Sequence, residues 1–185
     1  LNGDITAATV DVDALTGAVV LNEDVAISAT NTAVDFSGAT GVDAAVAGNQ
    51  GLTVSAGTGA VSLPVTGPTA LESLTVTTSG AIALGGNVGA VNDVQIGTDL
   101  TVSGDIVRLS AMGTGQALGS LTVTSATGTT LAGNIDADDT GGSTGNISIT
   151  GGEITLAGNL TIDSADAGAD GGAITLANID GNAAA

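Results

Sequence analysis

The chain has 185 residues and one basic residue, Arg108, against 19 acidic ones, so its formal net charge is −18. It contains no histidine, cysteine, tryptophan or tyrosine. These absences exclude Ser-His-Asp and Cys-His catalysis, imidazole and thiolate metal sites, and disulfide bonds. A single cation cannot neutralise a row of phosphates or hold an anionic lipid surface, so we expect no nucleic-acid partner and no binding to anionic membranes. No run of 18 apolar residues is present, so we expect no membrane insertion.

Apolar residues make up 43% of the chain, which is too high for a disordered polyanion. The chain has 30 glycines and a single aromatic residue, Phe36, which we expect to fill the core of an early rung. A compact globule of this length normally packs several aromatic rings. A core of small aliphatic side chains must be thin everywhere, and this composition favours a solenoid. With Leu1 first and no basic segment before it, the sequence shows no signal peptide, so we expect a processed chain or a piece of a longer one.

In chain order, a first family of alternating tripeptides recurs from residue 52 onward. The first residues of its first five members are separated by 22, 26, 21 and 26 residues. Its members are Leu52-Thr-Val54, Leu74-Thr-Val76, Leu100-Thr-Val102, Leu121-Thr-Val123, Ile147-Ser-Ile149 and Leu160-Thr-Ile162. Large apolar residues alternate with hydroxyl residues, and this period of two predicts β-strands with one buried side.

A second family consists of similar tripeptides, most of which follow a glycine by one or two residues. Its members are Val19-Val-Leu21, Val61-Ser-Leu63, Ile82-Ala-Leu84, Ile154-Thr-Leu156 and Ile174-Thr-Leu176. Gly-Asn pairs lie between the strands and predict corners, because both residues tolerate positive φ and stacked asparagines can hydrogen-bond up the stack. The pairs are Gly48-Asn49, Gly86-Asn87, Gly133-Asn134, Gly145-Asn146, Gly158-Asn159 and Gly181-Asn182.

Together these repeats predict an all-β fold, a single-stranded parallel β-helix with roughly eight rungs of about 20–26 residues and three short strands each. We expect one domain over 1–185, with less regular rungs in 1–44 and clear repeats in 45–180. The coil is expected to be right-handed and triangular or flattened in section. Neither terminus carries a recognisable cap, so we expect further rungs in a longer chain or self-association, end to end or laterally.

The segments GLTVSAGTGAVSL (51–63), ALESLTVTTSGAIALGGNV (70–88) and LGSLTVTSATGTTLAGNI (118–135) resemble the repeats of filamentous-haemagglutinin-like adhesins and related β-strand-repeat bacterial surface proteins. The resemblance covers most of residues 45–180. It implies a secreted, extracellular shaft with a structural or adhesive role in a surface fibre, filament or biofilm matrix, facing a host-cell or matrix surface. It implies no catalytic residues.

Two acidic, glycine-rich loops are candidate calcium sites, because Ca²⁺ takes six to eight oxygen ligands and glycine lets carbonyl groups turn toward an ion. One loop holds Asp163, Asp166 and Asp170, and the other holds Asp136, Asp138 and Asp139. Asp11 and Asp13 form a weaker third candidate. The alternative is that these are ordinary solvated turns, because neither main loop matches an EF-hand or a repeated GGxGxD pattern.

A carboxylate-based polysaccharide lyase or hydrolase is the less favoured alternative, and we expect a non-enzymatic protein. Such an enzyme could use Asp136, Asp138 and Asp139, but Arg108 is the only cation available to neutralise charge. Arg108 itself is either a lone surface charge or an ion-pair partner for a nearby acid such as Asp105.

Outward hydroxyl residues of the first family predict a ladder on one flat face. The predicted ladder consists of Thr53, Ser55, Thr75, Thr77, Thr101, Ser103, Thr122, Thr124, Ser148 and Thr150. Ice-binding solenoids use Thr-x-Thr ladders of this kind, so the face could bind ice or another regular polymer, or dock on a neighbouring rod. Threonine also suits any exposed strand, and an ordinary solvated sheet face stays open as an interpretation.

Overall fold

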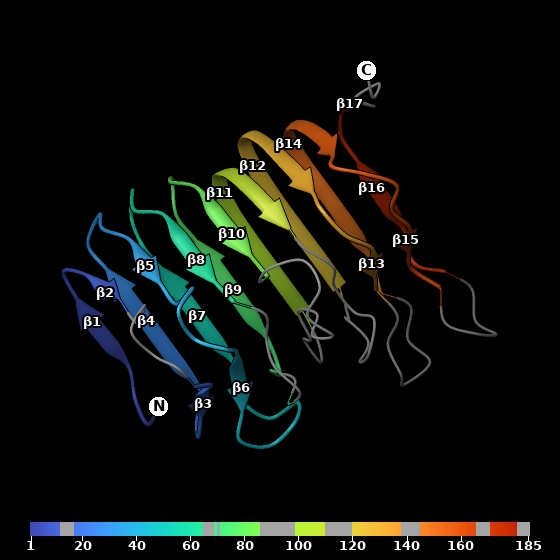
Figure 1. Cartoon of the computed structure of the whole chain (residues 1–185). Coiled ribbons are helices and arrows are strands. Elements are labelled where there is room, and N and C mark those ends of the chain that lie inside the picture. The colour runs from blue at the N-terminus through green and yellow to red at the C-terminus, as the bar shows by residue number, and fades with distance from the viewer. Residues whose placement is uncertain are drawn as a thin grey trace.

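The structure is a computed structural model that describes residues 1–11, 17–64, 69, 71–85, 99–109, 120–137, 145–165 and 171–180. For Asp11, 99–109 and Asp136 the description is confined to the backbone. Every regular element in these residues is a β-strand, and every strand pair is parallel. Figure 1 shows the strands stacked as successive turns of one winding chain. The predicted all-β solenoid is confirmed.

The first face of the solenoid is a parallel ladder in which each strand pairs with its equivalent in the next turn. Its strands are β1 (Ile5–Ala7), β4 (Val25–Ala29), β7 (Leu52–Ser55), β9 (Leu74–Thr77), and the first parts of β11 (Asp99–Leu109), β12 (Ser120–Leu131) and β14 (Ile147–Leu156), followed by β16 (Ile174–Leu176). Equivalent positions lie 22 residues apart between Ile5 and Ile27 and 27 apart between Ile27 and Val54. Turn length therefore varies while register is kept.

The second face is a matching parallel ladder that follows the first face in each turn. Its strands are β2 (Val10–Asp11), β5 (Val34–Asp35), β8 (Val61–Leu63), β10 (Ile82–Leu84), the second parts of β11, β12 and β14, and β17 (Ile179–Asp180). The three long strands run through both faces, and the β12–β14 register shifts between Ser125 and Gly128. Such irregularities bend a strand, and this bend forms the corner between the two faces.

The third side is described by two strand pairs and one residue. The pairs are β3 (Val19–Leu21) with β6 (Val42–Ala44), and β13 (Ile135–Asp136) with β15 (Ile162–Asp163). The amide of Ala44 extends the first pair by donating to the carbonyl of Thr69 at 3.1 Å, two residues before the buried Leu71. All three sides are therefore described in the turns that begin with β1, β4, β7, β12 and β14, fewer than the roughly eight rungs expected. Those that begin with β9, β11 and β16 are described on two faces.

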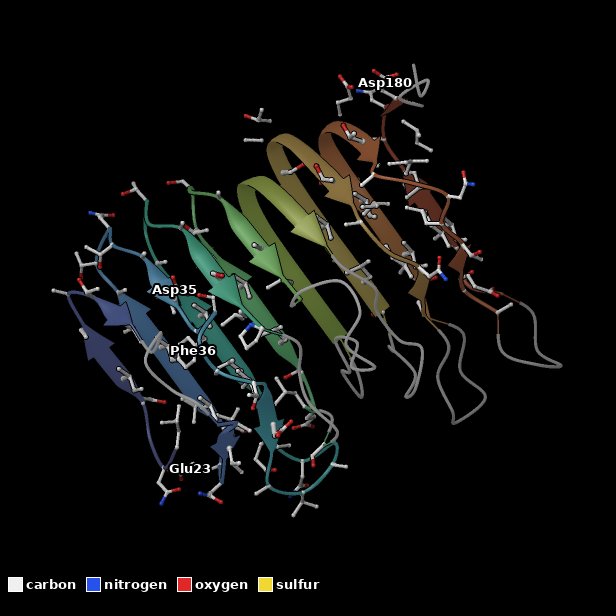
Figure 2. The ribbon with its side chains drawn as sticks, viewed as in Figure 1. Glu23, Asp35, Phe36 and Asp180 are labelled. Atoms are coloured by element: carbon white, nitrogen blue, oxygen red, sulfur yellow. The ribbon has the colours of Figure 1, made fainter. Side chains whose placement is uncertain are left out.

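The core is a thin column of aliphatic side chains, because only alternate residues of each strand point inward. One such column stacks Ile27, Val54, Val76, Val123 and Ile149, each at most 1% exposed. Burial of each such side chain contributes about 1.5–3 kcal/mol, so stability grows turn by turn. The expectation for Phe36 is confirmed, since it is 2% exposed and its amide donates to the carbonyl of Ser62 at 2.8 Å (Figure 2).

Three tripeptides lie on a different side from most members of their sequence family. Leu160-Thr-Ile162 was assigned to the first family, but Ile162 pairs with Ile135 on the third side. Ile174-Thr-Leu176 was assigned to the second family, yet it pairs with Ile147–Ile149 on the first face. Val19-Val-Leu21 pairs with Val42–Ala44 on the third side. An alternating tripeptide fits any of the three sides, and the position of the corners decides which side it joins.

The Gly-Asn pairs behave as predicted in one respect and not in another. Asn134 accepts a hydrogen bond from the amide of Thr161 at 2.9 Å, and Asn146 accepts one from the amide of Ala173 at 2.9 Å, each in the next turn. Positive φ, however, occurs at only one described member of these pairs, Gly48. The non-glycine residues with positive φ are Asn31 and Asn178, outside the pairs. Gly86-Asn87 and Gly181-Asn182 lie outside the described residues.

Candidate functional site

The outward side chains of the first face form two parallel columns of hydroxyl groups. The strand register aligns Thr53, Thr75, Thr101, Thr122 and Ser148 in one column, and Ser55, Thr77, Ser103, Thr124 and Thr150 in the other. In the turns whose side chains are described, the two residues that flank the central inward side chain therefore both point outward. All ten residues of the predicted ladder thus lie in register, and whether the ladder binds anything stays a prediction.

Exposure along the two columns is uneven. Thr53, Ser55, Thr77, Thr122 and Thr124 are exposed, whereas Thr75, Ser148 and Thr150 are half-buried; for Thr101 and Ser103 only the backbone is described. The hydroxyl of Thr150 also donates to the carbonyl of Val123 in the preceding turn at 3.3 Å. Part of the ladder therefore hydrogen-bonds within the solenoid instead of facing solvent alone.

The register adds residues that the sequence reasoning missed. Thr6 and Ser28 extend one column toward the N-terminus, and Thr175 extends the other beyond Ser148. The β1 and β4 tripeptides lack the Leu-Thr-Val form, and Thr175 lies in a tripeptide assigned to another face. Neither column contains a charged residue, although the chain carries 19 acids. Neighbouring hydroxyls along a column lie about 4.8 Å apart, as paired strands do.

The corner before the first face holds a polar column that the tripeptide motif did not include. The residues just before the apolar tripeptides of the first face are Asp24, Gly51, Ser73, Ser120, Asn146 and Ala173 in the described turns with side chains. The amide of Gly51 donates to Oδ1 of Asp24 at 2.8 Å, just as the amide of Ala173 donates to Asn146. A short polar residue precedes four of these six tripeptides, at Asp24, Ser73, Ser120 and Asn146, and this was the available signal.

A shallow hollow of about 220 Å³ opens at the start of the first face. Its lining consists of Asp4, Asp24, Val25, Ala26, Gly51, Thr53, Glu72 and Ser73. The hollow forms where Ala26 stands opposite Thr53 and where Gly51 lacks a side chain. Oδ1 of Asp4 already accepts the amide of Ala26 at 2.8 Å. Within the described residues, no three acidic side chains come together in a way that could hold a metal ion.

The chain was compared with protein-family models, curated proteins and solved structures. No protein-family model, curated protein or solved structure matches the chain. The functional interpretation therefore depends on the fold, the registers and the sequence resemblance.

The first acidic residues of the two predicted calcium loops, Asp136 and Asp163, belong to neighbouring strands. β13 pairs with β15, which puts Asp136 in register with Asp163 in the next turn. Asp163 is exposed, and its Oδ1 accepts the amide of Ala165 at 3.0 Å, which shapes the start of the second loop. The other predicted ligands, Asp138, Asp139, Asp166 and Asp170, lie outside the described residues, as does Asp13. In the weaker third candidate, Asp11 is in register with Asp35.

An acidic pair that the sequence did not reveal joins β14 to β17. The side chain of Glu153 hydrogen-bonds to Asp180, and this bond, the negative charge of Asp180 and slight desolvation raise the pKa of Glu153 above its ordinary value. Like charges close together favour the protonated form of one partner. The pair is 27 residues apart in sequence, so only the coil register brings it together.

Arg108, the one arginine, lies on the second face. Its backbone is in register with Ala83 on one side and Thr130 on the other. Arg108 was expected to be either a lone surface charge or a partner of an acid such as Asp105, and the structure does not describe the side chains that would distinguish the two. Arg108 and Asp105 belong to the same strand, β11, so a pairing between them would lie within one turn of the solenoid.

Proposed function

We propose that this chain is a non-enzymatic structural or adhesive segment of an extracellular fibre, filament or biofilm matrix at a bacterial surface. The observation that carries the proposal is the unbroken parallel register from β1 to β16 on the first face. Each turn hydrogen-bonds only to its neighbours, so adding turns lengthens the rod without changing its section. A fold of this kind projects or spaces whatever it carries.

Side-chain hydrogen bonds between turns support a mechanical role. Asp24, Asn31, Asn134 and Asn146 each accept an amide hydrogen from the following turn, at 2.8 to 3.2 Å. These bonds tie the corners together where the backbone ladder is interrupted. The sequence resemblance to adhesin repeats supports the surface location, and the charge of −18 keeps such a rod soluble.

Electron microscopy of the purified chain tests the proposal together with a search for catalysis. We expect rods or filaments, and no product from neutral or acidic polysaccharides incubated with the protein. Globular particles, or release of sugar products that saturates with substrate, would contradict a structural role.

The uncharged hydroxyl face is the specific observation that favours a second candidate function, binding to ice. The members of the two columns lie in register and carry no charge, and threonine has a methyl group beside its hydroxyl. A charged mineral would need charged ligands, and sugars usually stack on aromatic rings, which this face lacks.

Thermal hysteresis checks this second candidate. We expect a freezing-point depression for the wild type that is strongly reduced in Thr53→Lys, because a lysine interrupts the exposed column. Ser62→Lys, on the outward side of the second face, is the matched control and should keep the activity. Absence of hysteresis in the wild type removes ice and leaves the structural role alone.

Calcium binding at the two acidic loops that begin at Asp136 and Asp163 is also part of the proposed function, as a stabiliser of the rod. If the register of Asp136 over Asp163 serves an ion, Ca²⁺ should raise the melting temperature by several degrees, and Asp163→Asn should abolish that increase. Glu23→Gln removes the same charge at an exposed residue outside the three candidate sites and should keep the calcium effect. An equal increase with NaCl at matched ionic strength would assign the effect to screening and contradict a defined site.

A further inference from the structure

The two hydroxyl columns of the first face consist of side chains that can bind a copy of themselves. We call them the Thr53 column and the Ser55 column, after their first members in the predicted ladder. A hydroxyl group donates one hydrogen bond and accepts up to two, so a hydroxyl column offers a second one both donors and acceptors. A column of carboxylates, which only accept, has no such self-complementarity.

The repeat of the columns is the same in any two copies of the chain. Strand pairing sets it at about 4.8 Å per turn, and the register of the Ser55 column is unbroken from Ser28 to Thr150 although turn lengths differ. Two surfaces with different repeats come out of step within a few turns, whereas two copies stay in step along the whole face. Short side chains in equally spaced columns also interdigitate well between sheets that pack face to face.

Charge determines which side of this polyanion a second copy can approach. Each copy has a net charge of −18. Asp35 and Asp180 belong to strands of the second face, and Asp163 belongs to the third side. On the first face, Asp4 and Glu72 line the hollow at the start of the strands, and neither column contains an acid. Among the described residues, the columns are therefore the surface on which two copies can meet without opposing carboxylates.

We infer that the first face is a surface for lateral self-association, on which a second copy of this chain packs its own hydroxyl columns. The contact rests on the structural role proposed above and gives that role a partner, a second rod of the same chain. Its most accessible groups are the exposed hydroxyls of Thr53, Ser55, Thr77, Thr122 and Thr124.

The size of the face makes this association weak and reversible. The Ser55 column has seven members, from Thr6 to Thr150. Seven turns and two columns give a contact about 30 Å long and about 12 Å wide, or about 350 Å² per copy, which is below the roughly 800 Å² per partner of a standard stable interface. Salt should strengthen the contact, because it screens the repulsion between the acids that surround two uncharged faces.

Sedimentation velocity of the full chain over a range of protein concentrations, at low and high NaCl, tests this contact. We expect a dimer whose fraction rises with protein concentration and with NaCl. Ser55→Asp should raise the dimer dissociation constant about tenfold or more, because it opposes like charges across the contact. Ser62→Asp is the matched control, since it adds the same charge in the same turn on the second face, and it should leave the constant nearly unchanged.

A second matched pair of variants lies within one strand, β12. Thr124→Asp changes the first face and Thr130→Asp changes the second face, and each adds one negative charge to the same turn. Thr124→Asp should weaken the dimer as Ser55→Asp does, whereas Thr130→Asp should not. Circular dichroism checks that each variant keeps its β-structure.

Four outcomes would overturn the inference. A chain that stays monomeric at every concentration in high NaCl has no such contact, although rods in electron microscopy would still support the structural role. Equal weakening by the first-face and second-face variants would assign the effect to net charge. A dimer that NaCl weakens would depend on ion pairs, for which Arg108 is the one basic residue. A dimer or filament that neither first-face variant affects would have its contact elsewhere, such as between the ends of two rods.

Discussion

Replacing Gly151 by alanine should lower the free energy of unfolding by about 3 kcal/mol or more, because two separate penalties combine at this corner. A Cβ atom at Gly151 would lie 1.9 Å from the carbonyl oxygen of Ser125 in the preceding turn. That neighbour is backbone held in the β12–β14 ladder, so it cannot move aside cheaply. Gly151 also has φ of 102°, which L-residues rarely adopt. Urea denaturation followed by circular dichroism measures the loss.

Gly158→Ala is the matched control for this prediction. A Cβ atom there meets nothing within 4 Å, and Gly158 is not among the described residues with positive φ. We expect a change of no more than about 1 kcal/mol, in either direction. Equal losses at Gly151 and Gly158 would contradict the close stacking of turns at the first corner.

The fold class could be predicted from the sequence because two independent signals agree. Alternation of apolar and hydroxyl residues determines which side chains are inward, and the 21–26-residue spacing requires that equivalent strands stack in parallel. The inward positions Leu74, Leu121 and Ile147 illustrate the result, because the register stacks all of them on the first face. A thin core whose one aromatic ring is that of Phe36 does not suit a compact globule.

The side to which each strand belongs was less predictable. Leu160-Thr-Ile162 and Ile174-Thr-Leu176 have the same pattern as their relatives, yet they lie on the third side and the first face. Corners are made by backbone conformation and local hydrogen bonds that a tripeptide does not encode. In the interior of one corner, for example, Thr129 donates to the hydroxyl of Ser125 at 2.9 Å. That bond satisfies two buried hydroxyl groups, and the sequence alone does not show that the bend at this corner buries both of them.

The candidate sites also differ in how far the sequence could predict them. The hydroxyl ladder lies within the most regular strands, so period and spacing were sufficient to align its ten predicted residues, although Thr6, Ser28 and Thr175 were missed. The stacking of Asp136 over Asp163 depends on the third side, and the Glu153–Asp180 pair depends on a strand of two residues. Contacts between irregular segments depend on turn length to within one residue, and the turns of this chain vary in length.

The inward direction of the alternating residues leads to the second large expected effect. Val123→Asp should unfold the middle turns, with a loss of more than about 4 kcal/mol, because it puts a carboxylate into a core without a cation. Val123 is 0% exposed and stacks between Val102 and Ile149. In a solenoid each turn depends on its neighbours, so a break in the middle also weakens the turns on both sides. Thermal denaturation should show loss of β-structure at room temperature or a broad transition far below that of the wild type.

Thr124→Asp is the matched control, because it adds the same charge one residue further along β12. The two variants together separate the effect of burial on stability from the effect of charge. Thr124 is exposed and points outward beside Thr150 of the next turn, so its replacement should cost no more than about 1 kcal/mol. A shift of β12 by one residue would exchange the two positions, because successive side chains point to opposite faces. Thr124→Asp would then be the damaging variant and Val123→Asp the tolerated one, so the pair of variants measures the register itself.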